Sequence, residues 1–450
     1  MEILATIFQG ILDTGAAVFL PIVLFIIGII VKMKPSKAFS AGLTLGVAFV
    51  GISMVTAFIS ETVGAAGTAF VQNTGINLTA LDMGWAPSLG LAWSWKYAFL
   101  MFPIQIGINV IMLLFGWTDT LNVDMWNVAN KICTGFLVYV ISGSMVLGFA
   151  IAAVEVVLEL KNADATKKQF YQTTGIPGCS MPHPMFLSNI IFYPLVQILD
   201  KIFPTKQRYN IANLKEKIGI FAENHVMGFI VGTFIGLMGQ YSIQEAVLLG
   251  VQAGAALTVL PLVSQLFMTA LAPISDATNK WVKSKFPGKE IVIGLDWPVL
   301  AGNPEIWVTI ILTIPVAILT AMVLPGNIVL PFGNLLSVCV PAALFMSTQG
   351  DLIKMLILSF ISVPILFWSA SYFAPVFTEL AAQTGGLESL GIVGDNMLAW
   401  WGMDIAEIRW LVCKAIEFNP IALVGMVGFI ALTWYYFKEM KKKEDSIVIK

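Results

Sequence analysis

Polar side chains that interrupt the apolar stretches of this sequence are its candidate functional residues. An ionisable group inside a bilayer costs at least about 2.5 to 3.5 kcal/mol, so it normally faces a partner, water or a ligand. Carboxylates accept hydrogen bonds from hydroxyl groups, and tryptophan rings offer flat faces to C–H surfaces, a combination that suits a polyol or a sugar. The residues in question are Asp82, Ser142, Ser144, Glu155, His183, Glu223, His225, Asp296, Asn303 and Glu305.

Asp82 and Asp296 hold matching places in two similar stretches. Residues 81–93, "LDMGWAPSLGLAW", and residues 295–307, "LDWPVLAGNPEIW", both begin Leu-Asp and then place Trp, Pro, Leu, Gly and a final Trp in the same order. We therefore expect both aspartates to line one central site, with Trp85 supplying an aromatic face. The alternative is that each aspartate caps the N-terminus of a half-helix, and capping is compatible with ligand contact.

The chain has two histidines, and both stand in unusual surroundings. His183 is bracketed by prolines in "SMPHPMF", which holds the backbone extended and leaves the imidazole free to point into a cavity, although a structural role is equally open. His225, in "FAENHVMGF", is interpreted as a structural residue, either a cap or an interface residue. A protonatable group beside a reacting hydroxyl could serve as a general base, and His183 and Glu223 are the candidates.

Composition defines the environment of these residues. Of 450 residues, 58% are hydrophobic and 12% are charged, far below the roughly 25% charged residues of a soluble protein. Apolar runs long enough to cross a bilayer recur along the chain, which predicts an all-α polytopic membrane protein with about eleven transmembrane helices. We expect them at residues 16–31, 40–59, 97–117, 133–157, 185–199, 226–240, 246–271, 306–324, 335–346, 352–373 and 421–437.

Charge and cysteine content exclude several other classes. A net charge of −2 argues against a nucleic-acid-binding surface. The four cysteines are scattered, without a Cys-x-x-Cys pair or a histidine-rich cluster, so we expect buried thiols, no metal site and no cofactor. The sequence also contains no nucleophile motif, so an intramembrane enzyme has little support.

The two similar stretches indicate an internal repeat. Gly42 and Gly46 precede the first stretch where Gly250 and Gly254 precede the second. An odd number of predicted crossings separates the halves, which predicts inverted repeats, the device by which many transporters build a midplane site from broken helices. We expect a single membrane domain over residues 1–437, with repeats at roughly 16–200 and 220–374, two re-entrant hairpins, a closing helix at 421–437 and a basic tail at 438–450.

Lysine placement predicts the orientation of the chain. The basic tail should be cytoplasmic. Counting back through eleven crossings puts residues 32–37, 201–217 and 280–289 on the same side. Residues 159–168, "ELKNADATKK", then fall outside in spite of their three lysines, which makes the count near them the weakest part of this topology.

Five motifs carry a resemblance to a known family: "AFVGI" at Ala48, "NVDMWN" at Asn122, the "IP…PH" region ending at His183, "IGLD" at Ile293 and "LPGNIVLPFGNL" at residues 324–335. In order and spacing they resemble the galactitol-type enzyme IIC membrane component of the bacterial phosphoenolpyruvate-dependent sugar phosphotransferase system (PTS), over nearly the whole chain.

The resemblance implies a multi-pass homodimer among the lipids of the bacterial cytoplasmic membrane, with a substrate-carrying core that moves in elevator fashion. It implies that a cytoplasmic IIB protein, charged by a IIA protein, phosphorylates the sugar alcohol from a phosphocysteine. The chain would then be a transport subunit and no enzyme on its own. The substrate-binding residues we expect are Asp82, Trp85, Ser142, His183, Glu223, Asp296 and Asn303.

Two departures from the family pattern fall near these residues. The aspartate of "IGLD" is followed by Trp297 rather than proline, and Gly302 is followed by Asn303 rather than histidine. "FGEP" is replaced by "FAEN", which keeps Glu223. Galactitol, or a related hexitol or pentitol, therefore fits the pattern. The alternative is an ion-coupled secondary transporter in which Asp82, Asp296 and Glu305 bind H⁺ or Na⁺.

Overall fold

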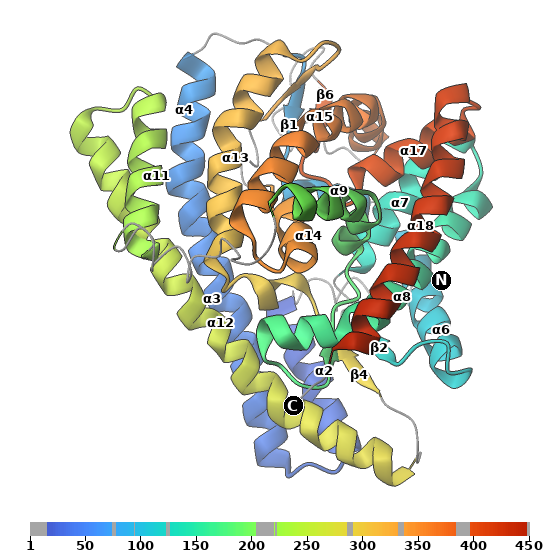
Figure 1. The fold of residues 1–450 in the computed structure, drawn as a ribbon. Coiled ribbons are helices and arrows are strands. Elements are labelled where there is room, and N and C mark those ends of the chain that lie inside the picture. Colours follow the sequence, from blue (N-terminus) through green and yellow to red (C-terminus); the bar gives the residue numbers. More distant parts are fainter. Residues whose placement is uncertain are drawn as a thin grey trace.

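The structure is a computed structural model and describes residues 16–73, 78–93, 95–122, 127–203, 220, 223–285, 291–331, 337–383 and 397–447. Most of them are helical (Figure 1). The α-helices are α2 (Ala16–Ile30), α3 (Pro35–Ile59), α4 (Ala65–Asn73), α5 (Trp85–Trp93), α6 (Met101–Leu114), α7 (Val128–Ser142), α8 (Met145–Thr174), α9 (Asn189–Ile202), α11 (Asn224–Met238), α12 (Ile243–Lys285), α13 (Pro304–Val323), α14 (Cys339–Thr348), α15 (Leu352–Gln383), α17 (Ala406–Ile416) and α18 (Pro420–Ser446).

The chain is mostly helical, as an all-α membrane protein should be, and short strands join the helices into two small parallel sheets. One sheet has the order β5-β1-β6 and the other β2-β4-β3. Figure 1 draws β1 and β6 toward one end of the molecule and β2 and β4 toward the other. Extended segments inside a protein need partners for their backbone N–H and C=O groups, and pairing supplies them. The strands are β1 (Ala80–Asp82), β2 (Thr120–Asn122), β3 (Cys179–Ser180), β4 (Val292–Gly294), β5 (Val329–Leu330) and β6 (Met397–Ala399).

Each sheet combines strands from both halves of the chain. β1, from the first half, lies between β5 and β6 of the second half. β4, from the second half, lies between β2 and β3 of the first half. The two halves therefore contribute their strands in the same order to opposite sheets, and each sheet holds the halves together.

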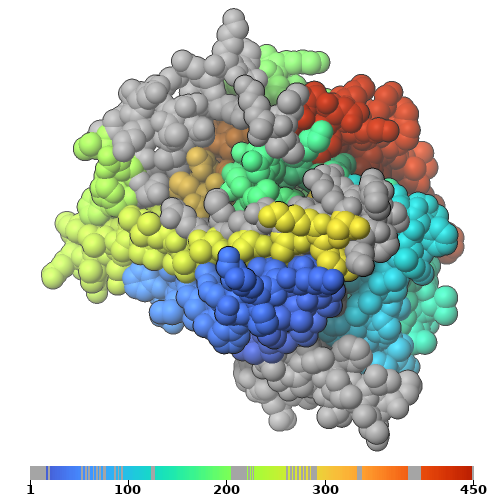
Figure 2. All heavy atoms as spheres, turned by 90° about the horizontal axis from the view of Figure 1, so that it is seen from below, coloured from blue at the N-terminus to red at the C-terminus, as the bar shows by residue number. Residues whose placement is uncertain are grey.

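Two helical pairs, α2–α3 and α11–α12, pack against each other, and glycines permit close contact within each pair. A Cβ at Gly42 or Gly46 of α3 would lie 2.7 Å from a backbone carbonyl oxygen of α2. A Cβ at Gly250 or Gly254 of α12 would lie 2.6 Å from a backbone carbonyl oxygen of α11. Figure 2 shows α12 lying along the N-terminal helices. Glycines at matching positions of the two halves thus bring matching helices together.

The apolar stretch expected as one span at residues 133–157 is instead two antiparallel helices, α7 and α8. They turn at Gly143, whose φ of +68° favours glycine. Lys131 contacts Glu159, and Thr134 contacts Glu155. The contacting residue numbers rise along α7 as they fall along α8, as expected for antiparallel helices. Hydropathy could not reveal the turn because both helices are apolar on either side of it.

This extra turn corrects the predicted topology. The backbone N–H of Lys168 donates to Glu444 Oε1 at 3.0 Å, and Lys168 Nζ donates to the Glu444 carbonyl at 2.9 Å. Residues 159–168 therefore lie on the same side as the C-terminal basic residues, and placing them on the opposite side was wrong. The lysines that conflicted with the charge rule now agree with it.

The length of the C-terminal helix also differs from the expectation. α18 continues to Ser446, so most of the predicted tail, residues 438–446, belongs to the closing helix. Within the described ranges, four helical segments are long and apolar enough to cross a membrane: Pro184–Ile202, Pro304–Val323, Leu352–Gln383 and Pro420–Ser446. The larger count of about eleven spans and the two re-entrant hairpins stay predictions.

Candidate functional site

Asp296 follows strand β4 and is the centre of a buried polar cluster. It caps the short 3₁₀ helix Trp297–Leu300, and its Oδ1 accepts the Trp297 backbone N–H at 2.6 Å. The same oxygen accepts a hydrogen bond from Asn127 Nδ2 at 3.0 Å. Only 8% of Asp296 is exposed. The carboxylate therefore caps a helix, as one of the two sequence interpretations expected, and also contacts another side chain.

His183 reaches Asp296 from the neighbouring strand. β3 pairs with β4 in parallel, with Ser180 opposite Gly294, so the two chains leave the sheet side by side. His183 Nε2 lies 3.4 Å from Asp296 Oδ1, and His183 Nδ1 accepts the backbone N–H of Met185 at 3.2 Å. Because Nδ1 is an acceptor here, the proton of the neutral ring belongs on Nε2, facing the carboxylate.

Asn127 comes from the segment after β2, the other neighbour of β4. It is the N-cap residue of α7, but its side chain makes no capping hydrogen bond and reaches Asp296 instead. Its amide oxygen accepts a hydrogen bond from Asn130 Nδ2 at 3.2 Å. All three strands of this sheet thus deliver one member of the cluster, which explains why residues so distant in sequence meet.

Buried charges extend the cluster along α7. Lys131 Nζ lies 2.5 Å from Glu159 Oε2 of α8, and neither side chain is exposed. The same ammonium lies 3.3 Å from the backbone carbonyl of Asn127, to which it donates. Charges removed from water in this way must be paired, so the Lys131–Glu159 pair ties α8 to the end of α7 that carries the Asp296 contact.

A second buried ion pair brings in α17. Arg409 Nε donates to Thr134 Oγ1 at 2.8 Å, and Arg409 Nη2 donates to the Asn130 carbonyl at 2.8 Å. The same guanidinium lies 3.6 Å from Glu155 Oε1. Thr134 also donates to Glu155. A continuous polar network therefore runs from Asp296 through α7 to Arg409.

This arrangement is suited to binding hydroxyl groups. Asp296 offers carboxylate oxygens as acceptors, while His183 Nε2 and Asn127 Nδ2 are donors on the same side of it. Within the described residues no group of three or more His, Cys, Asp or Glu is arranged for a metal ion. The donors and acceptors of the cluster are those of neutral and charge-assisted hydrogen bonds.

The structure places Asp82 away from this cluster. Asp82 ends β1 in the other sheet, is 1% exposed and accepts the backbone N–H of Trp401 at 3.1 Å. Its sheet and that of Asp296 lie toward opposite ends of the molecule (Figure 1). Trp85 begins α5 and is 42% exposed. The two matching aspartates hold equivalent places in two sheets, rather than sharing one site as expected.

The remaining expected ligand residues make local contacts. Ser142 Oγ donates to the Val138 carbonyl at 2.6 Å within α7. Asn303 is the N-cap of α13, and its Nδ2 donates to the Leu300 carbonyl at 2.8 Å. Glu223 lies 3.3 Å from His225 at the start of α11, where 31% and 61% of the two side chains are exposed. The structure therefore brings together His183 and Asp296 of the expected set.

Several members of the network escaped the sequence analysis. Asn127 ends the "NVDMWN" motif, which was noted without assigning a role to this residue. Glu159 was also missed, although it lies four residues after the candidate Glu155, a spacing that puts both on one face of a helix. Lys131 and Thr134 are polar residues three positions apart within the apolar helix α7. This spacing is the signal that could have predicted carboxylate partners for both of them.

The chain is similar to known proteins over nearly its whole length. The family described as "PTS system sugar-specific permease component", EIIC-GAT, matches residues 10–387. The chain is similar to the "PTS system galactitol-specific EIIC component" of Escherichia coli K12, with 31% identity over 455 residues, covering 98% of this chain and 99% of the relative. The protein of the same name from Escherichia coli O157:H7 matches at 31% identity with the same coverage.

Proposed function

This chain belongs to the EIIC-GAT family of PTS sugar-specific permease components, and we propose on that premise that it carries galactitol or a closely related polyol. It is a membrane permease component and not an enzyme on its own. Similarity over nearly its full length to galactitol-specific components supports the substrate class. The replacements at Trp297 and Asn303 concern the immediate neighbourhood of Asp296, so a hexitol or pentitol other than galactitol belongs to the same proposal.

The observation that carries the proposal is the cluster of Asp296, His183 and Asn127. In it a buried carboxylate is held between an imidazole N–H and an amide N–H at 3.4 and 3.0 Å. A polyol that enters would replace these internal contacts with hydrogen bonds to its own hydroxyl groups, so Asp296 would accept and His183 and Asn127 would donate. The remaining candidates contribute through their helices: Asn303 by starting α13, and Ser142 by ending α7.

Lysine positions support an orientation with this cluster toward the cytoplasm. The α2–α3 turn, the end of α12 and the end of α18 lie at the end of the molecule that holds β2 and β4 (Figure 1). The turn carries Lys32 and Lys34, and Lys167 pairs with Asp119 at 2.7 Å immediately before β2. An excess of lysine marks the cytoplasmic side. The C-terminus would then be cytoplasmic as well.

A cytoplasmic position suits phosphorylation by a separate protein. The phosphoryl group would pass from the phosphocysteine of a IIB protein, itself charged by a IIA protein, to a polyol hydroxyl: the P–S bond breaks, a P–O bond forms and the hydroxyl proton passes to a base. His183 is our candidate for that base. Its Nδ1 lone pair accepts from Met185 here, so the role requires that this hydrogen bond be released or that the ring change tautomer. The charged product cannot recross an apolar barrier.

The architecture supports a moving carrier built from inverted repeats. Each sheet takes its central strand from one half and its outer strands from the other, and matching glycines join α2 to α3 and α11 to α12. In transporters built from such repeats, one repeat moves against the other, so that the binding site opens alternately to the two sides of the membrane. We extend the proposal to an elevator motion within a homodimer, for which the largely exposed apolar helix α18 offers a face toward lipid or a second copy.

Vesicle uptake tests the function. Membrane vesicles containing the chain, a IIA protein and a IIB protein should accumulate labelled galactitol as its phosphate only when phosphoenolpyruvate is present, and an uncoupler should leave uptake unchanged. Accumulation of free polyol that an uncoupler abolishes would instead establish an ion-coupled transporter and overturn the proposal. Competition by other unlabelled hexitols and pentitols would rank the substrates.

A further inference from the structure

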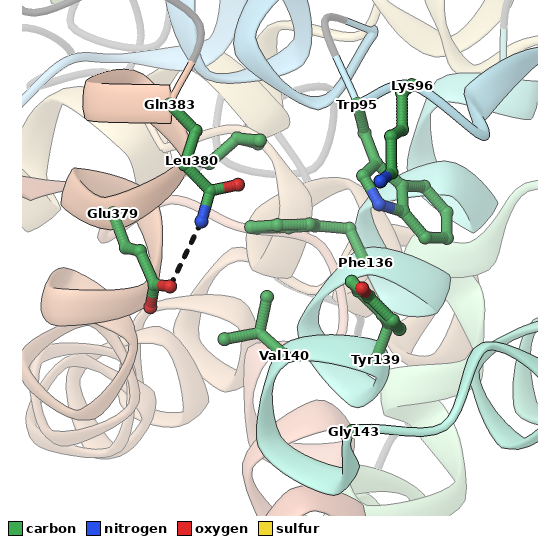
Figure 3. Close-up of a pocket in the computed structure, with 9 residues that line it drawn as sticks. All are labelled: Trp95, Lys96, Phe136, Tyr139, Val140, Gly143, Glu379, Leu380 and Gln383. Atoms are coloured by element: carbon green, nitrogen blue, oxygen red, sulfur yellow. Dashed lines mark hydrogen bonds between the residues drawn. The ribbon is translucent and has the colours of Figure 1, made fainter.

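A hollow lies between α7, α15 and the segment that joins α5 to α6. Its volume is about 350 Å³, which falls within the range of about 300 to 1,000 Å³ typical of small-molecule pockets. Figure 3 shows its lining side chains converging from these elements. It is lined by Trp95, Lys96, Phe136, Tyr139, Val140, Gly143, Glu379, Leu380 and Gln383.

This cavity is separate from the Asp296 cluster. Asn127 precedes the first residue of α7, whereas Tyr139 and Val140 lie in its last turn. At a rise of 1.5 Å per residue, Tyr139 lies roughly 18 Å along the helix from Asn127. The cavity is therefore at the opposite end of α7, on the side away from the lysine-rich end of the molecule.

The floor of the cavity is aromatic. Trp95 and Phe136 are 4% and 2% exposed, and the Trp95 ring stacks on Phe149 with 5.4 Å between ring centroids. Tyr139 lies against the same tryptophan, with centroids 5.6 Å apart. These contacts fix the Trp95 ring without using its N–H group. Flat, rigid aromatic faces of this kind contact the C–H surfaces of carbohydrates and polyols.

One polar group in this floor lacks a partner. Among the residues that the structure describes, the buried Trp95 Nε1 has no hydrogen-bond acceptor. Figure 3 draws this nitrogen on the edge of the ring nearer Phe136, toward the cavity. A buried N–H without a partner costs about 1 to 3 kcal/mol. An acceptor brought by a ligand would remove that cost.

The rim is polar and its formal charges balance. Lys96, Glu379 and Gln383 are exposed at the mouth, and Gln383 Nε2 donates to Glu379 Oε1 at 3.1 Å. The rim therefore offers both donors and acceptors. The positive charge of Lys96 is offset by the negative charge of Glu379, so the site has no preference for an anion.

We propose that this cavity is a second binding site, for a neutral polyhydroxylated ligand of about hexitol size, distinct from the Asp296 site. Its aromatic floor contacts the carbon chain, Trp95 Nε1 donates to one hydroxyl, and Glu379 and Gln383 bind others at the rim. The ligand class rests on the proposed function. Two sites at opposite ends of α7 would let one substrate wait outside while another is carried and phosphorylated.

Equilibrium dialysis of the purified full-length protein against labelled galactitol tests the proposal, with competition by other hexitols and by pentitols. The wild type should bind two ligands per chain. Asp296→Asn should keep the cavity site. Trp95→Phe, which preserves the ring and removes the N–H, should weaken that site by about tenfold, as should Gln383→Leu. Trp117→Phe is the matched control because Trp117 is 57% exposed and lies outside the cavity.

Each outcome is decisive. Two sites that fail independently, one in Asp296→Asn and one in Trp95→Phe and Gln383→Leu, support the inference. A single site abolished by Asp296→Asn and unaffected at residues 95 and 383 overturns it while leaving the proposed function intact. A single site lost at residues 95 and 383 alone supports the cavity and contradicts the proposed role of Asp296. If no polyol binds, both proposals fail. Elution of every variant as a single symmetric species excludes misfolding.

Discussion

His183 Nε2 lies 3.4 Å from Asp296 Oδ1, although the two residues come from different halves of the chain. The parallel pairing of β3 with β4 brings them together, and the pairing of β2 with β4 adds Asn127. A three-stranded sheet of eight residues thus organises the group to which we assign substrate binding.

Replacing the carboxylate tests this assignment directly. Asp296→Asn keeps the shape of the side chain but removes its charge, so we expect polyol uptake at limiting substrate to fall by about 10- to 100-fold, the value of one or two charge-assisted hydrogen bonds. The measurement is phosphoenolpyruvate-dependent uptake in vesicles. Glu417→Gln, which alters an exposed carboxylate paired with Lys414, is the control and should transport normally. Normal uptake by both variants would refute a role for Asp296.

Asn127 should matter through its contact with Asp296. Asn127→Leu removes the donor and leaves the carboxylate with one partner fewer, so we expect affinity for the polyol to fall by about tenfold. Asn127→Asp should be more harmful because it sets a second carboxylate about 3 Å from the first. Ligand affinity by dialysis and uptake rate would be compared. Equal effects of the two variants would argue that Asn127 only fills space.

The buried pair of Lys131 and Glu159 predicts a non-additive effect on stability. Lys131→Met strands the carboxylate of Glu159 without a cation, which should cost about 3 to 5 kcal/mol of unfolding free energy. Adding Glu159→Leu should restore most of the loss because no unpaired charge then remains. Unfolding of the detergent-solubilised protein, followed by intrinsic fluorescence, gives the comparison. A double variant as unstable as the single one would contradict this explanation.

Chemical labelling can settle the corrected topology. Lys161 is exposed and donates to the Trp117 carbonyl near the end that carries the basic C-terminal residues, whereas Lys96 is at the mouth of the cavity at the other end. Lys161→Cys should react with a membrane-impermeant maleimide only in inside-out vesicles, and Lys96→Cys only in intact cells. The four natural cysteines, three of them buried, supply the background reaction in the parent protein. Labelling of both positions from the same side of the membrane would contradict the corrected topology, in which α7 and α8 form a hairpin and these two lysines lie on opposite sides.

Close helix packing makes Gly250 sensitive to one methyl group. A Cβ there would clash with the Thr233 hydroxyl and would lie 2.6 Å from a backbone carbonyl oxygen of α11, so Gly250→Ala must force α11 from α12, at a cost of about 1 to 3 kcal/mol. Gly107→Ala is the matched control because nothing lies within 4 Å of its Cβ, and it should be neutral or slightly stabilising. Thermal unfolding of both variants gives the answer, and equal midpoints would show that α11 and α12 separate at no cost.

Local sequence was sufficient for several features. The apolar runs predicted the helices at 306–324, 352–373 and 421–437 to within a few residues of α13, the first part of α15 and the first part of α18. Prolines around His183 predicted an extended backbone, which is observed at φ −113° and ψ 134°. The motifs predicted the family, which the similarity to EIIC-GAT proteins confirms. Each of these depends on neighbours along the chain.

Other features depended on contacts between distant segments. The turn at Gly143 escaped detection because hydropathy does not change across it, and that error placed residues 159–168 on the wrong side. Asp82 and Asp296 share a motif, yet strand pairing sends them to different sheets. The sequence by itself determined that the chain is a membrane permease and which residues are costly to bury. Only the tertiary structure decided which of them meet. The pairing of β2 and β3 with β4 joins segments that are far apart in sequence, and local sequence patterns do not predict such long-range contacts.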